Sequence, residues 1–416
     1  MASPKLRFKE FDDDWTKICI DDHSETVTSG SRDWAQYYSD SGDKFIRMTN
    51  LVRDGIYLDL SDLRYVKLPN DSNEGKRTSL VAGDILISIT AELGKLGWIP
   101  TGLGTAYINQ HTALVRMKKE NDSKFVAYSL STDKYNNKLN SLNDSGAKAG
   151  LNLGTIRNFE LLLPSKEEQT QIASFLSAVD EKIAQLTQKH ELLSQYKQGM
   201  MQRLFSQQIR FKANDGSAFG EWEELKFLEL MDDLWDYRGK TPKKLGMDWG
   251  GGKIQSLSAL NIKKGYIDFK ADCHLGSEKL YEKWMNKGNL ERNDIVFTME
   301  APLGNVALIP DNRKYILSQR VVCFKTKKDI VNNLFLFQLI ISEKFQNRID
   351  ELATGTTAKG INQKSMQKIL VNLPCLEEQT KIANFLSAID QKIEIVAQQI
   401  QQVKQWKKGL LKQMFV

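Results

Sequence analysis

The residue types that most often carry catalysis are few in this chain and form no recognisable site. Of its 416 residues, four are histidine and four are cysteine. The stretch WGGGKIQS around Lys253 superficially resembles a phosphate-binding loop, but it lacks the first glycine at the required spacing. Ile254 also stands where a Ser or Thr would bind magnesium. A glycine-rich turn is the better interpretation.

Other reactive residues do not combine into a site either. Cys273 and His274 are adjacent, but no second pair follows at zinc-ligand spacing, so an ordinary place in the fold explains them as well. His23 and His111 have no nearby Ser or Cys that would suggest a nucleophile. No glycine-rich dinucleotide loop and no Asn/Asp-Pro-Pro-aromatic motif of amino-methyltransferases is present. We therefore expect no active site, no metal site and no cofactor bound by this chain.

The composition is that of a globular protein, with 41% hydrophobic and 26% charged residues. The formal net charge of +6 permits a polyanionic partner without requiring one. Nothing resembles a signal peptide, and no apolar run approaches the roughly 20 residues that cross a bilayer. The four cysteines are widely spaced, which favours reduced thiols. These features predict a cytoplasmic protein without a membrane partner.

The elements that would position any site are set out by an internal repeat. The segment 164–205 aligns without gaps on 374–415, and 19 of the 42 positions are identical, at an offset of 210 residues. Apolar residues recur at steps of four and three in both copies, which predicts two long helices, each with a heptad seam. Ser165 and Glu168 form a capping-box pattern at the first helix start.

Two seams of equal length most simply pack on each other in an antiparallel pair. The alternative is that each helix separately covers its own globular domain. The same offset recurs faintly in the globular parts, where LVAGDILIS with Asp84 aligns on LERNDIVFT with Asp294, each predicting a strand after a turn. The loops at 26–44 and 236–252 are unlike each other. The predicted organisation is a globular domain at 1–163, a helix at 164–207, a second domain at 208–373 and a helix at 374–416.

Both helix starts carry a family motif. The second copy, LPCLEEQTKIANFLSAIDQKI, matches a Pro-Pro-Leu-x-Glu-Gln-x-x-Ile signature, with Cys375 in place of the second proline. The first copy has Ser165 and Lys166 in place of Pro-Leu. The globular parts open with LRFKEF…W and IRFK…W, and YRGKTP precedes the core of the second. Over nearly its whole length the sequence resembles the DNA-specificity subunit of type I restriction–modification enzymes.

This resemblance implies an α+β fold, with two α/β target recognition domains separated by two long antiparallel coiled-coil helices in a pseudo-twofold repeat. Each domain would read one half of a bipartite site in double-stranded DNA. The helices would set the spacer and dock two modification subunits, and two restriction motor–nuclease subunits would complete the complex. The chain itself would be non-catalytic, with S-adenosylmethionine, ATP and Mg used by the partner subunits. The resemblance also implies a bacterial, nucleoid-associated location.

Base reading requires Arg, Lys, Asn or Gln on loops, and phosphate contacts require Lys, Arg, Ser, Thr or backbone amides. Polar loops beside predicted strands supply the candidate DNA-binding residues, which are Ser29, Ser31, Arg32, Arg47, Asn50, Thr90, Lys95, Asn109, Gln110 and Lys148 in the first domain. Those of the second domain are Tyr237, Arg238, Lys240, Thr241, Ser258, Asn261, Thr298, Gln319, Arg320 and Lys359. For each one, a solvent-exposed or turn-stabilising role is an equal alternative.

Residues of the helix motif and seam are the candidates for subunit docking. They are Glu168, Gln169, Ile172, Leu176, Val179, Ile183, Glu378, Gln379, Ile382, Leu386, Ile389 and Ile393. Two other functions stay open at this point. The chain could serve a methylation-only or nuclease-fused system, or it could be a coiled-coil scaffold that holds two protein-binding domains and never touches DNA.

Overall fold

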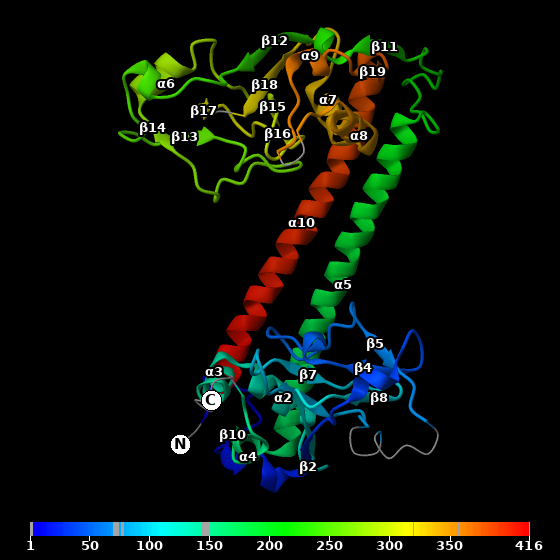
Figure 1. Ribbon diagram of the computed structural model, residues 1–416, viewed down its shortest axis with the longest axis vertical. Helices are drawn as coiled ribbons and strands as arrows, with labels where there is room; N and C mark the ends of the chain where they lie inside the picture. The colour runs from blue at the N-terminus through cyan, green and yellow to red at the C-terminus, as the bar shows by residue number, and fades with distance from the viewer. Residues whose placement is uncertain are drawn as a thin grey trace. The chain divides into compact units, whose positions relative to one another are not determined.

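The structure is a computed structural model, and it describes residues 3–69, 75, 79–142, 150–318, 320–355 and 358–415. The chain divides into two compact units (Figure 1). The first unit consists of residues 1–187 and 398–416, and the second consists of residues 188–397. Each unit therefore combines a globular domain with stretches of both long helices.

In the first unit, a four-stranded antiparallel sheet in the order β2-β9-β6-β7 forms the centre. A mixed sheet, β3-β5-β4-β8, and the pair β1-β10 complete it. The strands are β1 (Thr16–Cys19), β2 (Ser24–Ser29), β3 (Tyr38–Ser39), β4 (Asp43–Ile46), β5 (Arg64–Val66), β6 (Ile85–Ser88), β7 (Leu96–Trp98), β8 (Ala106–Ile108), β9 (Thr112–Met117) and β10 (Glu160–Leu163). The short helices are α2 (Ser123–Ser131), α3 (Asp133–Ser141) and α4 (Leu153–Arg157).

The second unit repeats this plan, with a central sheet in the order β12-β18-β15-β16, a sheet β14-β13-β17 and the pair β11-β19. Its strands are β11 (Glu223–Lys226), β12 (Met231–Asp236), β13 (Ile254–Leu257), β14 (Leu275–Gly276), β15 (Ile295–Thr298), β16 (Val306–Leu308), β17 (Tyr315–Leu317), β18 (Val321–Thr326) and β19 (Leu370–Leu373). Its short helices are α6 (Glu278–Trp284), α7 (Asn333–Ile341), α8 (Glu343–Leu352) and α9 (Gln363–Met366).

The predicted strands after Asp84 and Asp294 are present as β6 and β15. Both carboxylates are buried and paired with a cation on the neighbouring strand. Arg116 Nε lies 2.7 Å from an oxygen of Asp84, and Lys325 Nζ lies 2.7 Å from an oxygen of Asp294. The repeat in the sequence therefore has a physical basis, because each buried carboxylate needs an opposite charge at the same place.

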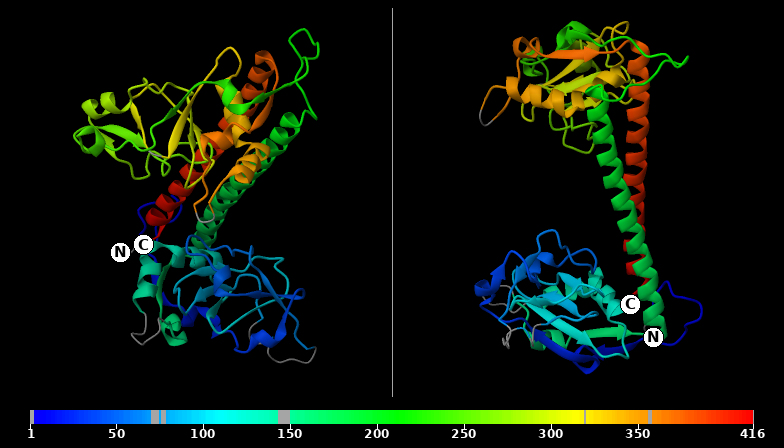
Figure 2. Two further views of the ribbon diagram at one scale, coloured as in Figure 1. Left: turned by 45° about the horizontal axis from the view of Figure 1, so that its top comes forward. Right: turned by 90° about the vertical axis from the view of Figure 1, so that its right-hand side faces the viewer.

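The long helices are α5 (Lys166–Phe205) and α10 (Leu376–Met414). In the first unit, the opening turns of α5 pack with the closing turns of α10, and both contribute to one hydrophobic core. In the second unit, the closing turns of α5 pack with the opening turns of α10 (Figure 2). Within each unit the helices therefore run in opposite directions.

One ion pair in each unit joins the two helices at equivalent positions. Asp180 contacts Lys407 at 2.5 Å in the first unit, and Asp390 contacts Lys197 at 2.7 Å in the second. Each aspartate also accepts a hydrogen bond from its own domain, from Tyr128 Oη at 2.6 Å and from Gln338 Nε2 at 2.8 Å. Burial and the Asp180 bond raise the pKa of Tyr128, so its hydroxyl stays a donor. These contacts fix how the helices align, because sliding either helix would separate partly buried charges.

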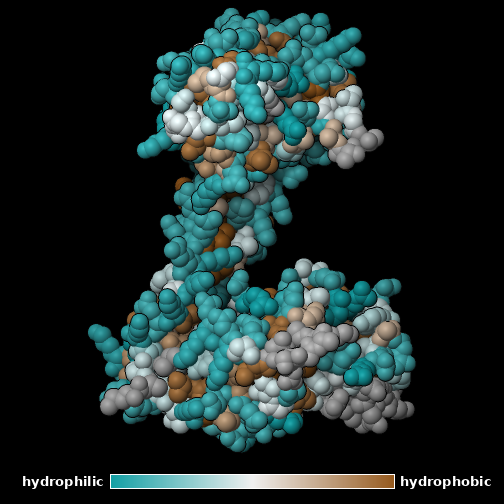
Figure 3. All heavy atoms as spheres, turned by 60° about the vertical axis from the view of Figure 1, so that its left-hand side comes forward, coloured by the Kyte–Doolittle hydropathy of each residue, from teal (hydrophilic) through white to brown (hydrophobic). Residues whose placement is uncertain are grey.

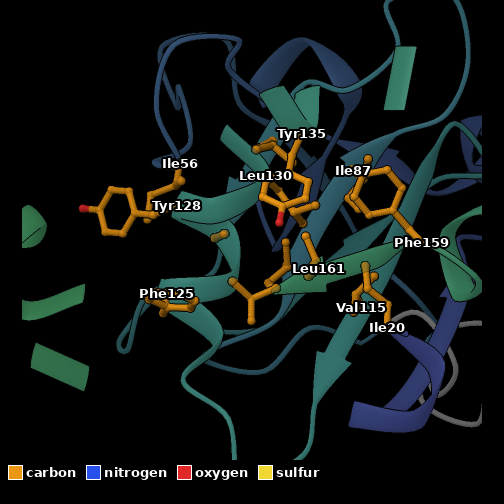
Figure 4. Close-up of a cluster of buried hydrophobic side chains, with 14 of the residues drawn as sticks. Ile20, Ile56, Ile87, Val115, Phe125, Tyr128, Leu130, Tyr135, Phe159 and Leu161 are labelled. Atoms are coloured by element: carbon orange, nitrogen blue, oxygen red, sulfur yellow. The ribbon is translucent and has the colours of Figure 1, made fainter. Parts of the chain in front are cut away.

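The end of α10 completes the core of the first unit, and the end of α5 completes the core of the second. Phe415, next to the end of α10, lies 5.2 Å from Phe125 and 6.3 Å from Trp15 between ring centres. Phe205, at the end of α5, lies 5.7 Å from Phe335 in the second unit. Figure 4 shows Phe125 of α2 with other side chains of the first core, including Val115, Tyr135 and Leu161. Within each unit, turns of both long helices therefore pack on the globular domain and on each other.

On the face drawn in Figure 3, hydrophilic side chains cover most of the surface of both units, and the apolar ones are scattered. In the part of the chain that the structure describes, no helix has both the length and the apolar character needed to cross a membrane.

Because Phe415 fills the first core and Phe205 fills the second, their loss should act on different units. We expect Phe415→Ala to lower the free energy of unfolding of the first unit by about 3 kcal/mol. Phe205→Ala should destabilise the second unit by a similar amount. Hydrogen exchange of α2 and of α7 reports the two units separately. Lys412→Ala, at an exposed position beside Phe415, is the matched control, and equal loss of protection in both helices would contradict this division.

Candidate nucleic-acid interface

In the first unit, a polar groove of about 560 Å³ lies where β2 ends and β9 begins. It is lined by Ser29, Gly30, Ser31, Arg32, Asp33, Thr90, Gln110 and His111. Five of these eight residues are predicted DNA-binding residues from three separate loops. The fold therefore brings together side chains that are up to 81 positions apart in the sequence (29 to 110).

The groove depends on a close approach of two backbones. Ser31 pairs with Asn109 in a parallel bridge, and the Gln110 N–H donates to the Ser31 carbonyl at 3.1 Å. A Cβ atom on Gly30 would overlap the carbonyl oxygens of Ile108 and Asn109. Only glycine therefore allows the loop after β2 to lie against the loop before β9.

His111 connects the other two loops of the groove. One of its ring nitrogens, Nδ1, lies 2.9 Å from Thr90 Oγ1. The other, Nε2, lies 3.0 Å from the side-chain amide nitrogen of Gln110. The sequence around His111 predicts no role for it, because no nearby Ser or Cys suggests a nucleophile. Its position directly after Gln110 was the available signal.

The second unit gathers charged side chains at the corresponding place. Arg238, after β12, donates from Nε to Asp236 Oδ2 at 2.8 Å. The hydrogen bond to Asp236 raises the pKa of Arg238, and the charge of Glu300 adds to this effect. Burial raises the pKa of Asp236, but the bonds from Arg238 outweigh it and lower the pKa overall. Arg320 Nε lies 3.6 Å from Glu300 Oε1, and its side chain is 54% exposed.

Lys359 belongs to this neighbourhood as well, because the next residue, Gly360, bridges to Glu300. Its Nζ lies 3.3 Å from Asp350. Three predicted DNA-binding residues of the second domain, Arg238, Arg320 and Lys359, therefore present exposed cations around the Glu300 loop. Cations of this kind are the groups that contact phosphates and guanine.

Four predicted DNA-binding residues are corrected by their burial. Asn50 and Asn261 are 1% and 2% exposed and hold their own loops, accepting from the N–H of Arg47 and of Ser258. Thr298 is fully buried and accepts from the Asn305 N–H. Tyr237 is 4% exposed in the second domain's core, where burial raises its pKa to about 12. Polar residue types on predicted loops do not distinguish loop-forming side chains from ligand-facing ones.

Five further predicted DNA-binding residues contact their own domain. Arg47 pairs with Asp62, and Lys95 pairs with Glu92. Lys240 donates to the Trp284 carbonyl at 2.6 Å. The hydroxyls of Ser258 and Thr241 accept from the N–H groups of Leu260 and Lys244.

Three predicted DNA-binding residues remain, namely Lys148, Gln319 and Asn109. Lys148 and Gln319 lie outside the described residues. Asn109 accepts from the His111 N–H at 3.1 Å and shapes the turn before β9. His274 stacks on Trp249, with ring centres 4.9 Å apart, as an ordinary fold position would allow. Among the described residues, no cluster of His, Cys, Asp and Glu could hold a metal ion.

The motif glutamates at the two helix starts are buried. Glu168 is 1% exposed, and its two carboxylate oxygens each accept a bond of 2.8 Å from Arg7. Glu378 is fully buried, and its two carboxylate oxygens accept hydrogen bonds of 3.1 and 2.7 Å from Arg210. Both arginines belong to the opening LRFK and IRFK stretches. In each unit, the opening motif therefore supplies the arginine of an ion pair, and the motif at the helix start supplies its glutamate.

The glutamines beside these glutamates act in the same way. Gln169 accepts from the Asp122 N–H at 2.9 Å and donates to the Pro164 carbonyl at 2.9 Å. Gln379 makes the equivalent bonds with Asn332 and Pro374. Each glutamine therefore ties the helix start to the domain it follows.

These positions correct the docking prediction for the motif residues. Buried Glu168, Gln169, Glu378 and Gln379 present no surface to a partner subunit. Of the seam residues, Ile172, Leu176, Val179, Ile382, Leu386 and Ile389 are at most 5% exposed, and Ile183 and Ile393 pack beside them. The capping box is only half present, because Ser165 Oγ accepts from the Glu168 N–H while the Glu168 carboxylate is held by Arg7.

Comparison with known proteins places this architecture in a family. The family model described as the type I restriction modification DNA specificity domain matches twice, at residues 12–195 and 221–405. The MjaVIII specificity subunit of a type I restriction enzyme from Methanocaldococcus jannaschii is 27% identical, over 87% of this chain and 83% of that protein. The EcoDI specificity subunit from Escherichia coli is 23% identical, over 55% of this chain and 54% of that protein.

Two solved structures share the fold. The S subunit of a type I restriction–modification system from M. genitalium aligns with a TM-score of 0.61 at 14% identity, covering 100% of this chain and 99% of that one. A chain from a study of complex assembly and conformational transition of the type I R-M system aligns with a TM-score of 0.54 at 14% identity, covering 97% of both chains.

The pair of Arg7 and Glu168 gives a direct stability prediction. Glu168→Gln leaves a guanidinium that is only 11% exposed without its counter-charge, so the first unit should lose about 3 kcal/mol of unfolding free energy. Hydrogen exchange in α2 measures this loss. Glu167→Gln, which removes an exposed carboxylate one residue earlier, should leave protection unchanged. Equal effects of both substitutions would show that helix-terminal charge matters and the ion pair does not.

Proposed function

The chain belongs to the family of type I restriction–modification DNA specificity subunits, and we propose that each of its two domains reads one half of a bipartite DNA target. The observation that carries this proposal is a repeated frame with unlike loops. A buried aspartate paired with a cation on the neighbouring strand, and the order of the central sheet, recur in both units. The groove of the first unit is lined by Ser, Thr, Gln and His side chains together with Arg32 and Asp33, and the second unit presents Arg238 and Arg320 beside Asp236 and Glu300. Different donors and acceptors on one frame are what two different half-sites require.

The two long helices have a second role in this proposal. They form one antiparallel pair around a pseudo-twofold axis, separate the two domains and set the spacer between the half-sites. Two modification subunits dock at equivalent places on the pair, using exposed helix faces, since the motif and seam residues are buried. The equivalent ion pairs of Asp180 with Lys407 and Asp390 with Lys197 support a symmetric arrangement.

Chemistry in this proposal belongs to the partner subunits. The modification subunits use S-adenosylmethionine to methylate adenine, and two restriction subunits use ATP and Mg to translocate and cut DNA. This chain contributes target selection and placement and binds no cofactor. The alternative of a scaffold that never contacts DNA has less support, because it does not explain why two domains built on one frame carry such different polar loops.

Exchange of one domain tests the assignment of half-sites. Residues 1–163 are replaced by the equivalent domain of another specificity subunit, and the chain is coexpressed with its modification subunit. We expect only one half of the methylated site to change, as mapped by single-molecule sequencing of the host DNA. A simultaneous change in both halves would contradict the assignment. Failure of the parent chain to bind DNA would favour the scaffold alternative.

The role of the helices in spacing has its own test. Insertion of four residues near 185–195 adds about 6 Å of helix, a little more than one turn, against a rise of about 3.4 Å per base pair of DNA. The preferred spacer should lengthen by one or two base pairs, while both half-site sequences stay the same. Four residues leave a stutter in the heptad, so some loss of stability is expected. An active variant with an unchanged spacer would show that the helices only dock partners.

A further inference from the structure

The hydrogen-bond roles around His111 follow from the donors and acceptors present. The side-chain nitrogen of Gln110 can only donate, so His111 Nε2, 3.0 Å away, must accept. A neutral imidazole then carries its proton on Nδ1, which donates to Thr90 Oγ1 at 2.9 Å. His111 therefore holds the Gln110 amide in one orientation.

This orientation leaves a defined pattern facing the groove. One N–H of Gln110 is used by His111, which leaves its second N–H and its Oε1. Among the described residues, neither of these groups has a hydrogen-bond partner within the chain. One free donor beside one free acceptor on a planar amide matches the major-groove edge of adenine, where N7 accepts and the N6 amino group donates.

The backbone beneath Gln110 is also held in place. Its N–H donates to the Ser31 carbonyl, and the Ile89 N–H donates to the His111 carbonyl at 3.1 Å. A long side chain on a fixed backbone, with its amide fixed by a neighbour, loses little further rotamer freedom when it meets a base.

The position of His111 has a counterpart in the second unit, at Arg320. The Met299 N–H donates to the Arg320 carbonyl at 2.9 Å, which is the bond that Ile89 makes to His111 in the first unit. Thr90 and Glu300 also correspond, since they bridge to Gly150 and Gly360. The partner of His111 is thus a hydroxyl, and the partner of Arg320 is a carboxylate. One place in the frame holds different side chains in the two domains, each oriented by the same loop.

We propose that Gln110 reads one adenine of the first half-site through paired hydrogen bonds, and that His111 is the positioning residue that orients its amide. This inference rests on the proposed function, because it names the residues with which the first domain discriminates bases. In the bound state Gln110 Oε1 accepts from the adenine N6 amino group, and its free N–H donates to N7. Thr90 fixes the ring of His111 through Nδ1.

The test uses the full chain assembled with its modification subunit and a DNA library randomised in the first half-site. Sequencing of methylated molecules gives the base preference at each position. The unaltered complex should prefer adenine at one position of this half-site, and Gln110→Ala should reduce that preference about tenfold or more. Preferences in the second half-site should stay unchanged.

Substitutions of His111 separate orientation from general structural support. His111→Gln can still accept from Gln110 at the place of Nε2, so it should keep the adenine preference. His111→Asn reaches only the place of Nδ1, and His111→Phe accepts nothing, so both should lose the preference at the same position. Arg320→Ala is the matched control in the other domain and should alter only the second half-site.

Two results would overturn the inference while leaving the proposed function intact. Gln110→Ala could keep every base preference or weaken methylation equally for all sequences, which would make Gln110 a bystander or a phosphate contact. Full adenine preference in His111→Asn would remove the positioning role. Absence of any sequence preference in the unaltered complex would instead reject the proposed function itself.

Discussion

A buried carboxylate at the start of each long helix is the constraint on which the rest of the structure depends. Glu168 and Glu378 are almost fully buried, and each receives two bonds from an arginine at the beginning of its domain. A charge in this position is tolerated only with a close, hydrogen-bonded partner. The first residues of the domain, the last residues before the helix and the helix itself are therefore held at one point. Gln169 and Gln379 reinforce it through bonds to the adjacent backbone.

The far end of each helix adds a second constraint. Phe415 and Phe205 occupy the same place in the two copies of the repeat, and each one packs into a core whose other residues come mostly from the opposite copy. Neither domain has a complete core without the end of the other helix. This exchange explains why the helix ends keep an identical phenylalanine although most positions between 189 and 204 differ from their counterparts at 399–414. With both frames fixed in this way, the loops that line the groove are free to differ.

The sequence predicted the elements far better than the site. The two long helices and the strands after Asp84 and Asp294 were predicted from periodicity, which is local in the sequence, and these elements are present in the structure. The site required knowledge of where side chains point. Asn50 and Asn261 have the residue type of base readers, but they close loops, and this depends on carbonyls up to twelve residues away. His111 was missed because its partners, Thr90 and Gln110, define its role only once the loops are brought together.

The central claim is that the two domains engage the two halves of one DNA site separately, through the loops around Gln110 and Arg320. The most direct measurement is hydrogen exchange of the chain in its modification complex on DNA, with one half-site scrambled at a time. Scrambling the first half should remove DNA-dependent protection from residues 29–33 and 109–111 and leave it in residues 236–241. Scrambling the second half should do the reverse. Loss of protection in both regions when one half-site is scrambled would contradict this claim. So would DNA-dependent protection that lies only outside these loops.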